Sequence, residues 1–296
     1  MSQTTDFNKG LPVIKLVLSD IDNTLVPLGE RFASHRSINA IHDVIAAGVS
    51  FGPATGRDYF ELLRFFHMDE ACFMTGIISN GKRVRVDGEY VYQRLIPHEA
   101  LVRIDEVVHL MPGVFLVCYP ADSNMLNPAY GVGVTSEELA VYEARTSFNG
   151  STVDEVPNVD VIAATLACSG SPERARSVIQ AVEEAVPEVE LVSPFANWID
   201  ILPRGTSKAT SLDVLLEHLG IGIDEVVVFG DGGNDVAILD KVHYSVAVAN
   251  AVDVAKEAAN FQVGAAADEG VAEALEEIAR ATRAGEMPAF LSKEDQ

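Results

Sequence analysis

Four short polar segments, spread between residues 20 and 235, constrain the fold and the chemistry of this chain more than any other feature. They are Asp20-Ile21-Asp22-Asn23-Thr24, Thr55-Gly56-Arg57, Lys208 and Gly230-Asp231-Gly232-Gly233-Asn234-Asp235. The first, second and fourth follow runs rich in valine, isoleucine, leucine or phenylalanine. In a parallel sheet such runs are buried strands, and the residues after them lie where the strands' carboxyl ends open into a crevice. The segments therefore predict a single site at one edge of a doubly wound α/β sheet.

The order of the expected elements divides the chain into two domains. Strands and helices alternate up to about residue 89 and do so again from residue 204. Residues 90–203 contain helices and apolar runs, but no strand there ends in a catalytic-looking cluster. We therefore predict a Rossmann-like core of residues 1–89 and 204–296, with an α+β domain of residues 90–203 inserted into it. Residues 285–296 are expected to form a loose tail.

Composition limits the partners and the location of the protein. The formal net charge of -23 argues against nucleic acid or an anionic membrane surface as a partner, because both attract basic patches. No apolar run reaches membrane-spanning length, and residues 1–10 lack the apolar core of a signal peptide. Cys72, Cys118 and Cys168 lie far apart in apolar stretches, which indicates buried free thiols. We therefore expect a cytoplasmic protein, and the oligomeric state stays open.

The two aspartates of the first segment are candidates for phosphoryl-transfer chemistry. Asp20 and Asp22 are two residues apart at a strand's end, so their side chains point the same way if the strand geometry persists. One carboxylate can attack a phosphoryl group, and the other can donate and accept the proton. The alternative is a solvated turn, because aspartate and asparagine are common in loops.

The second and third segments offer groups that bind an anion. The Thr55 hydroxyl, with backbone amides that lead into a helix, can form a small anion cradle, although Thr55 can equally serve as the N-cap of that helix. Lys208 is expected at the start of a helix, where the helix dipole disfavours a cation. That position is reasonable if the ammonium offsets carboxylates and a phosphate; otherwise Lys208 is an ordinary surface lysine.

The fourth segment is the most specific. Its glycines allow a tight turn, and Asp231 and Asp235 flank Asn234. Oxygen ligands of this kind suit Mg²⁺, which keeps several waters and takes one or two carboxylates. A structural acidic turn is the alternative. The scattered histidines show no zinc pattern, and serine-hydrolase and P-loop motifs are absent from the sequence.

Taken together and in this order, the segments resemble the motifs of the haloacid dehalogenase (HAD) superfamily of phosphatases. Asp20–Thr24 resembles the first motif, Thr55 the second, Lys208 the third, and Gly230–Asp235 the fourth. The large insertion between the second and third motifs resembles the type IIB cap of the Cof-like subfamily. Further matches to that subfamily are Ala54-Thr55-Gly56-Arg57, Asn80-Gly81 and Asn250-Ala251.

The resemblance implies a role for each residue of the site. Asp20 is then the nucleophile and Asp22 the general acid/base. Mg²⁺ is held by the Asp20 carboxylate, the Asp22 carbonyl and Asp231, with support from Asp235. Asn23 stands where the first motif usually has glycine, and asparagine tolerates the unusual backbone angles of that position. The groups implied to hold the phosphoryl oxygens are the Ile21 backbone, Thr55, Gly56, Lys208 and Asn234.

The sequence thus predicts a Mg²⁺-dependent phosphomonoester hydrolase that acts on small phosphorylated metabolites, with sugar phosphates as the expected class. The first alternative is a phosphomutase of the phosphomannomutase type, which would need several basic cap residues to hold a bisphosphate. The second is a non-catalytic ligand sensor, against which the complete set of motifs argues. The arginines noted in the inserted domain are Arg94, Arg103, Arg145, Arg174 and Arg176.

Overall fold

The computed structural model describes residues 14–122, 129–146, 150–195 and 198–292. The chain forms two compact units, one of Met1–Tyr92 with Ser207–Gln296 and the other of Gln93–Thr206. Each unit has a hydrophobic core of its own. The first unit is called the core unit below, and the second the inserted unit. The functional boundaries at residues 90 and 203 stay a prediction.

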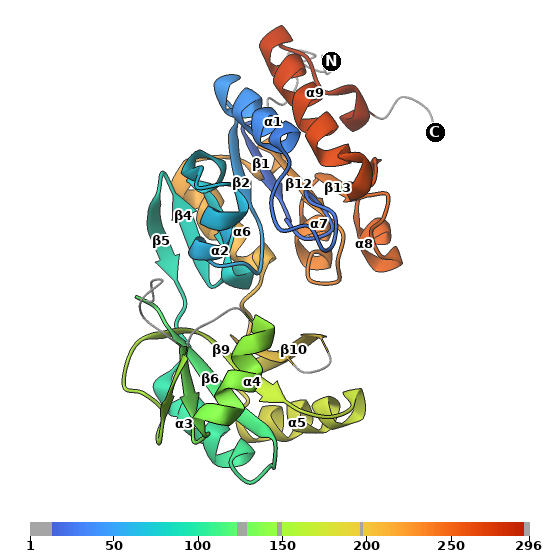
Figure 1. The fold of residues 1–296 in the computed structure, drawn as a ribbon. Coiled ribbons are helices and arrows are strands. Elements are labelled where there is room, and N and C mark those ends of the chain that lie inside the picture. The colour runs from blue at the N-terminus through green and yellow to red at the C-terminus, as the bar shows by residue number, and fades with distance from the viewer. Residues whose placement is uncertain (1–13, 123–128, 147–149, 196–197, 293–296) are drawn as a thin grey trace, which may run out of the picture. The chain divides into compact units, whose positions relative to one another are not determined.

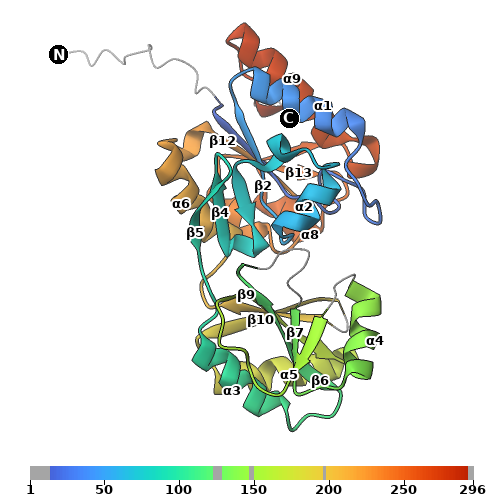
Figure 2. The same cartoon turned by 60° about the vertical axis from the view of Figure 1, so that its left-hand side comes forward.

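The core unit combines a parallel sheet, a small antiparallel sheet and helices (Figures 1 and 2). Its strands are β1 Leu16–Ser19, β2 Ser50–Pro53, β3 Gly76–Ile78, β4 Arg83–Val86, β5 Glu89–Gln93, β12 Val226–Gly230, β13 Tyr244–Val248 and β14 Phe261–Val263. Its α-helices are α1 His35–Ala46, α2 Tyr59–Phe65, α6 Lys208–Leu219, α7 Val236–Lys241, α8 Asp253–Ala258 and α9 Gly270–Ala284. Its 3-10 turns are η1 Glu70–Phe73, η2 Ser79–Gly81, η3 Ile223–Glu225, η4 Ala266–Asp268 and η5 Ala289–Leu291.

The parallel sheet has the strand order β14-β13-β12-β1-β2. From β1 the chain moves to β2 in one direction, and from β12 it moves through β13 to β14 in the other. Right-handed crossovers in opposite directions put their helices on opposite faces of the sheet, so the sheet is doubly wound as predicted. The order reverses between β1 and β12, and ligands of open α/β sheets bind at such a switch point.

Local sequence explains the helix that follows β1. In α1 the buried residues Ile38, Ile41 and Val44 recur at helical spacing and face the core. The Ser34 hydroxyl caps the helix by accepting a hydrogen bond from the Ser37 amide. Most exposed residues of the helix are polar, although Ile45 is also exposed, and α1 lies beside α9 in both views (Figures 1 and 2).

The small sheet has the order β3-β4-β5 and follows β2 along the chain. Asp87 and Gly88 both have positive φ, 50° and 88°, and join β4 to β5 as a tight turn. An isolated parallel bridge joins Ala54, directly after β2, to Ile77 of β3. This bridge holds the loop after β2 beside the small sheet.

The inserted unit is an α+β arrangement, as predicted. Its strands are β6 Val114–Pro120, β7 Ala129–Val132, β8 Gly150–Val153, β9 Val161–Cys168, β10 Val189–Phe195 and β11 Trp198–Pro203. Its helices are α3 His98–Val108, α4 Ser136–Thr146 and α5 Pro172–Ala185. One sheet has the order β10-β11-β9-β6-β7-β8, in which only the β7–β8 pair among the described strands is parallel.

Alternate residues of this sheet serve two different faces. Leu116, Leu166 and Ile199 belong to the main core of the unit, into which α3 and α5 also pack. Phe115 and Trp198 point to the other face and pack with a smaller cluster. The period of two along each strand therefore separates a closed apolar face from a face that carries aromatic and polar groups.

The cysteines and the C-terminal residues can also be compared with the predictions from sequence. Cys72, Cys118 and Cys168 form no disulfide bond with one another, and all three are buried, as predicted. The expected loose tail is wrong for its described part, because Ala289–Leu291 forms a 3-10 turn whose Leu291 is buried against the core; residues 293–296 lie outside the described residues. In the part of the chain that the structure describes, no helix is both long and apolar enough to cross a bilayer.

Candidate active site

The sheet topology brings the four polar segments to one edge. In the β1–β12 and β1–β2 registers, Ser19 lies opposite Phe229 and Pro53. Asp20 and Gly230, which start the first and fourth segments, follow Ser19 and Phe229 directly, and Thr55, which starts the second segment, lies two residues after Pro53. Lys208 is the first residue of α6 and reaches the same edge with its side chain. The predicted convergence is therefore present in the structure, and it lies at the switch point between β1 and β12.

Three carboxylates meet there. Asp20, Asp231 and Asp235 each offer an oxygen, and these oxygens lie within 4.8 Å of one another. The residues are 7%, 7% and 1% exposed. Burying one carboxylate without partners is unfavourable, and three together repel one another. Such a cluster needs positive charge.

Lys208 supplies one positive charge to the cluster. Its ammonium is 3.0 Å from Asp20 Oδ1 and 2.6 Å from Asp235 Oδ1, and the residue is 2% exposed. Burial disfavours the ammonium, but the two carboxylates outweigh burial and raise the pKa of Lys208. The structure thus excludes an ordinary surface lysine, and the unfavourable helix position is offset by direct ion pairs.

Burial disfavours the ionised form of Asp20. Burial raises its pKa to about 7, against the opposing effect of Lys208, and the charge of Asp235 adds to the increase. A hydrogen bond from the Ile21 backbone acts in the lowering direction. A further cation beside Asp20 would oppose this effect of burial and favour the ionised form of Asp20.

The remaining two carboxylates are held firmly by the loops around them. Asp231 accepts hydrogen bonds from Asn23 Nδ2 at 2.6 Å and from Thr24 Oγ1 at 2.7 Å. Burial still raises the pKa of Asp231 despite these donors. Asp235 Oδ2 accepts the amides of Asp231 and Gly232, at 3.1 and 3.0 Å. Both aspartates are therefore oriented before any ligand arrives.

Backbone geometry explains two residue choices in these loops. Asn23 has φ 63°, a left-handed conformation that asparagine tolerates, and this matches the sequence expectation. A Cβ on Gly230 would lie 2.7 Å from Asp235 Cβ, so glycine is required for the fourth segment to fold over itself.

Asp22 is placed differently from the other predicted residues. Strand β1 ends at Ser19, so strand geometry does not persist to Asp22, whose carboxylate is half exposed. Arg57 binds it with both ends of the guanidinium, at 2.9 Å from Nε to Oδ2 and 2.6 Å from Nη2 to Oδ1. Arg57 also lies over the Phe65 ring, 4.6 Å from its centre. Asp22 is therefore oriented by an arginine of the second segment.

The second segment forms a loop rather than a helix cap. Asp58 caps α2 in a capping box, so the N-cap interpretation of Thr55 is wrong. Thr55 is buried, and its Oγ1 accepts the Arg57 amide at 3.2 Å. The Thr55 amide donates to the Ile77 carbonyl at 2.9 Å. A Cβ on Gly56 would lie 3.0 Å from the Asn80 side chain, which keeps this loop close to η2.

The other predicted phosphate-binding groups lie on the same loops. Ile21 is buried between Asp20 and Asp22, whereas Asn234 is exposed on the loop between β12 and α7. The roles of all these residues in binding or catalysis stay predictions. The sequence did not predict two hydrogen bonds that hold the first segment: the Asn250 side chain donates to the Asn23 carbonyl at 2.7 Å and accepts the Ala266 amide at 2.7 Å. The only sequence signal for these contacts was the match of Asn250-Ala251 to the Cof-like subfamily.

The donor set fits a divalent metal ion. The three clustered carboxylates offer hard oxygen atoms, as Mg²⁺ prefers, and they face the single ammonium of Lys208. Both oxygens of Asp235 already accept hydrogen bonds. Both oxygens of Asp231 likewise accept hydrogen bonds, from Asn23 and Thr24, so these contacts do not separate Asp231 from Asp235 as a direct ligand. The metal roles of the three aspartates stay predictions.

Comparisons with known proteins agree with this geometry. A curated relative is the 5-amino-6-(5-phospho-D-ribitylamino)uracil phosphatase YbjI of Escherichia coli (strain K12), 27% identical over 268 residues, which are 90% of this chain and 96% of the relative. A haloacid dehalogenase-like hydrolase from Bacteroides thetaiotaomicron has a TM-score of 0.76 at 21% identity and covers 90% of this chain and 99% of its own. The HAD subclass IIB sugar phosphatase BT4131 has a TM-score of 0.70 at 24% identity and covers 88% and 98%.

The extent of the family match decides the assignment. The model of the haloacid dehalogenase-like hydrolase family matches residues 17–275, which include all four segments and the inserted unit. The chain therefore belongs to the haloacid dehalogenase-like hydrolase family, as a phosphatase of its Cof-like branch.

Proposed function

We propose that the protein is a Mg²⁺-dependent phosphomonoester hydrolase that acts on small phosphorylated metabolites through an aspartyl-phosphate on Asp20. The observation that carries this proposal is the buried Asp20 carboxylate at the switch point, 3.0 Å from the Lys208 ammonium and clustered with Asp231 and Asp235. A carboxylate in that position has a cationic partner for an incoming phosphate. It also lies on rigid elements that hold its direction.

In the first step, an oxygen of Asp20 forms a bond to phosphorus while the bond from phosphorus to the ester oxygen breaks. Asp22 gives its proton to the departing alkoxide, so the first product leaves as an alcohol. Lys208, Thr55, Asn234 and the amides around Ile21 and Gly56 would then hold the equatorial phosphoryl oxygens, whose charge Lys208 offsets. Bound Mg²⁺, held by Asp20, Asp231 and the Asp22 carbonyl, would supply further charge neutralisation.

In the second step, water attacks the phosphorus of the aspartyl-phosphate, and the bond to Asp20 breaks. Asp22 accepts the proton of that water and returns to its starting form. The bidentate contact with Arg57 keeps the Asp22 carboxylate in one direction through both steps. One exposed and well-oriented carboxylate thus serves as acid and then as base.

The substrate class is proposed from relatives and from charge. YbjI is named for a phosphorylated ribitylamino compound, and BT4131 for sugar phosphates. Both names describe phosphate esters of polyhydroxylated carbon chains. The net charge of -23 disfavours polyanions such as nucleic acids. We therefore propose phosphate esters of sugars or sugar alcohols as substrates, in the cytoplasm where free cysteines persist.

The phosphomutase alternative is less well supported. A mutase must hold a bisphosphate as it turns, which calls for basic side chains on the inserted unit. Arg94, Arg103, Arg174 and Arg176 instead contact groups of that same unit. Their contacts are the Arg204 carbonyl, Glu188, the Pro112 carbonyl and Glu173, respectively. The side chain of Arg145 is not among those that the structure describes.

The decisive experiment is a screen of phosphorylated sugars, sugar alcohols, nucleotides and phosphopeptides with Mg²⁺ and with a chelator. We expect release of inorganic phosphate from the sugar-type esters, loss of that release on chelation, and beryllium fluoride trapped on Asp20. Isomerised sugar phosphate without free phosphate would identify a mutase. Undiminished activity under chelation would disprove the metal assignment, and preference for a phosphopeptide would disprove the substrate class.

A further inference from the structure

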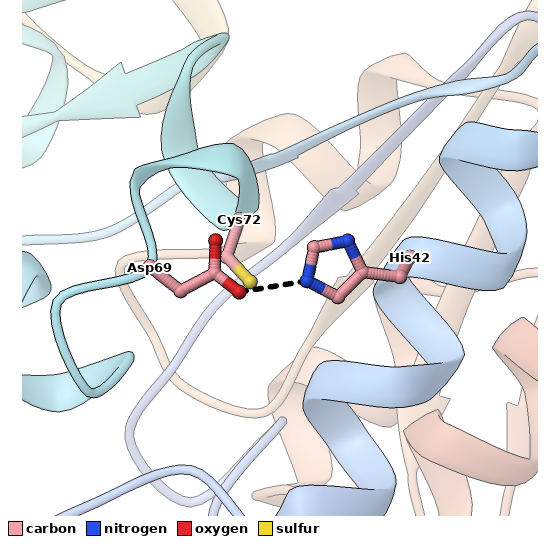
Figure 3. A group of neighbouring side chains, drawn as sticks. All are labelled: His42, Asp69 and Cys72. Carbon is pink, nitrogen blue, oxygen red and sulfur yellow. Dashed lines mark hydrogen bonds and ion pairs between the residues drawn. The ribbon is translucent and has the colours of Figure 1, made fainter.

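A second group of metal-ligating side chains lies outside the active site. His42 comes from α1, while Asp69 and Cys72 come from the turn that leads into β3 (Figure 3). The active-site residues follow the carboxyl ends of strands, whereas Asp69 and Cys72 precede the amino end of β3. None of the three contributes to the proposed hydrolysis.

The three side chains point toward one another. His42 Nε2 is 2.7 Å from Asp69 Oδ2, and the Cys72 sulfur completes a set of ligand atoms that lie within 4.8 Å of one another (Figure 3). The exposed fractions are 45% for the His42 side chain and 32% for Asp69, and Cys72 is fully buried. The group thus has a closed side at the thiol and an open side toward solvent.

The carboxylate is oriented from behind. Asp69 is the N-cap of η1, and its Oδ1 accepts the Ala71 amide at 3.2 Å, which leaves Oδ2 directed at His42. The Cys72 amide donates to the Asp69 carbonyl at 3.4 Å, so the two ligands on this turn share one short backbone unit. Supported carboxylates of this kind are typical of built metal sites.

The three ligand atoms favour one class of metal ion. One nitrogen, one oxygen and one sulfur suit a borderline-soft ion such as Zn²⁺ and are a poor set for Mg²⁺. Zinc–nitrogen and zinc–oxygen distances of about 2.0–2.1 Å in a tetrahedral site put the two ligand atoms about 3.3 Å apart, so the His42–Asp69 pair must open by about 0.6 Å. His42 is half exposed on its helix, so its ring has room to make that adjustment.

We propose that His42, Asp69 and Cys72 form a Zn²⁺ site in which water takes the fourth position. On binding, the Cys72 sulfur bonds to the metal and its proton passes to solvent, so the charge of the buried sulfur is compensated by the cation. The site joins α1 to η1, and both of these elements pack against β2, the strand that leads to Thr55. Zinc would therefore stabilise the part of the core unit that supports the second segment.

Cobalt spectroscopy tests this proposal independently of hydrolysis. The protein is held in excess Mg²⁺ so that the oxygen-only cluster of the active site is occupied, and Zn²⁺ or Co²⁺ is added. We expect one equivalent of Zn²⁺ to bind and the Co²⁺ form to show a sulfur-to-cobalt charge-transfer band. The carboxylate cluster contains no sulfur and cannot give that band.

Matched variants locate the site. Cys72→Ala should remove the charge-transfer band, whereas Cys118→Ala, which changes another fully buried free thiol, should keep it. His42→Ala alters a half-exposed residue, so it should fold normally and bind Zn²⁺ at least about tenfold more weakly. Absence of the band in the unmodified protein, its persistence in Cys72→Ala, or unchanged affinity in His42→Ala would overturn the proposal. If Cys72→Ala does not fold, the His42→Ala affinity decides.

Discussion

The two units of this protein bury different kinds of side chain. The core unit buries ionised groups at the edge of its parallel sheet, where Lys208 and Asp235 are 2% and 1% exposed. Among the described residues of the inserted unit, the buried polar side chains are the uncharged Thr165 and Thr206. The core unit also buries Lys82, Arg83 and Arg85, in and beside β4, so buried charge by itself does not mark the site. Burying charge is unfavourable unless the charges have partners, and the edge of the parallel sheet differs in gathering three carboxylates around one lysine.

The inserted unit carries its polar groups on the side of the sheet away from its main core. Asp200, which is half-buried, accepts hydrogen bonds from Thr165 at 3.3 Å and from the Trp198 ring nitrogen. Such a surface offers shape and hydrogen-bonding groups, whereas the core unit holds the proposed nucleophile Asp20 and the ammonium of Lys208. The comparison implies that the same type of substitution will change kcat more in the core unit than in the inserted unit.

The largest difference is expected between two aspartates. Asp20→Asn removes the proposed nucleophile with almost no change in volume and should lower kcat by about 10⁴-fold or more. Asp200→Asn makes the same change in the inserted unit and should alter kcat for a small aryl phosphate by less than about tenfold, because it touches no reacting atom. Steady-state kinetics on both purified variants measure this. Comparable losses in the two would break the division of roles between the units.

The second difference is between two lysines of the core unit. Lys208→Ala removes the ammonium that faces Asp20 and should cost about 10²–10³ in kcat, by analogy with the loss of one donor to a developing oxyanion. Lys241→Ala removes a lysine whose partners are the exposed Asp213 and a helix carbonyl, and the loss should stay within about twofold. A change confined to KM in Lys208→Ala would show that this lysine binds substrate without stabilising the transition state.

The catalytic edge was predictable because each part of it depends on a local pattern. Strands β1, β2 and β12 are short apolar runs, and the parallel sheet brings whatever follows them to one edge. The direction of Asp22 was not predictable in the same way. It depends on where β1 ends, on the left-handed Asn23 and on an arginine thirty-five positions away. Contacts of that range leave no periodic signal in one sequence.

The inserted unit shows a second limit of sequence reasoning. Strands β7 and β8 are four residues long, and β8 is mostly polar and partly exposed. Their sequences contain no apolar run or regular alternation long enough to predict strands. The tail prediction failed for a different reason: Phe290 and Leu291 are a short apolar pair whose packing against the core unit depends on the fold already being present. Pattern length, more than burial, decides what a sequence reveals.

The third difference is between two arginines. Arg57→Lys keeps the charge but loses the two-pronged contact with Asp22, and we expect kcat to fall by about tenfold with little change in KM. Arg103→Lys weakens a half-exposed pair with Glu188 in the inserted unit and should leave kcat unchanged. Kinetics over a range of pH values would separate a loss of orientation from a loss of binding. Full activity in Arg57→Lys would mean that Asp22 needs no such orientation.

The smallest expected effect concerns stability and pH. Burial raises the pKa of Asp20 from 3.8 to about 7, so between these values the folded chain keeps a proton that the unfolded chain has lost. The folded state therefore binds more protons in this window, and the contribution of Asp20 to stability falls as pH rises and is lowest above about pH 7. Asp20→Asn removes this titration and keeps a side chain of the same size.

Thermal unfolding with a chelator present measures the effect. We expect the Tm of Asp20→Asn, relative to the unmodified protein, to increase as pH is raised from about 5 to about 8. Added Mg²⁺ should reduce that difference at the higher pH, because a cation beside the carboxylates favours the ionised form of Asp20. Asp200→Asn in the inserted unit is the matched comparison, because it removes a carboxylate that is outside the charge cluster. If the Tm difference between Asp20→Asn and the unmodified protein did not depend on pH, Lys208 would already balance the charge cluster of the core unit. The two units would then differ in where their carboxylates lie, and not in how strongly burial disfavours the charge of those carboxylates.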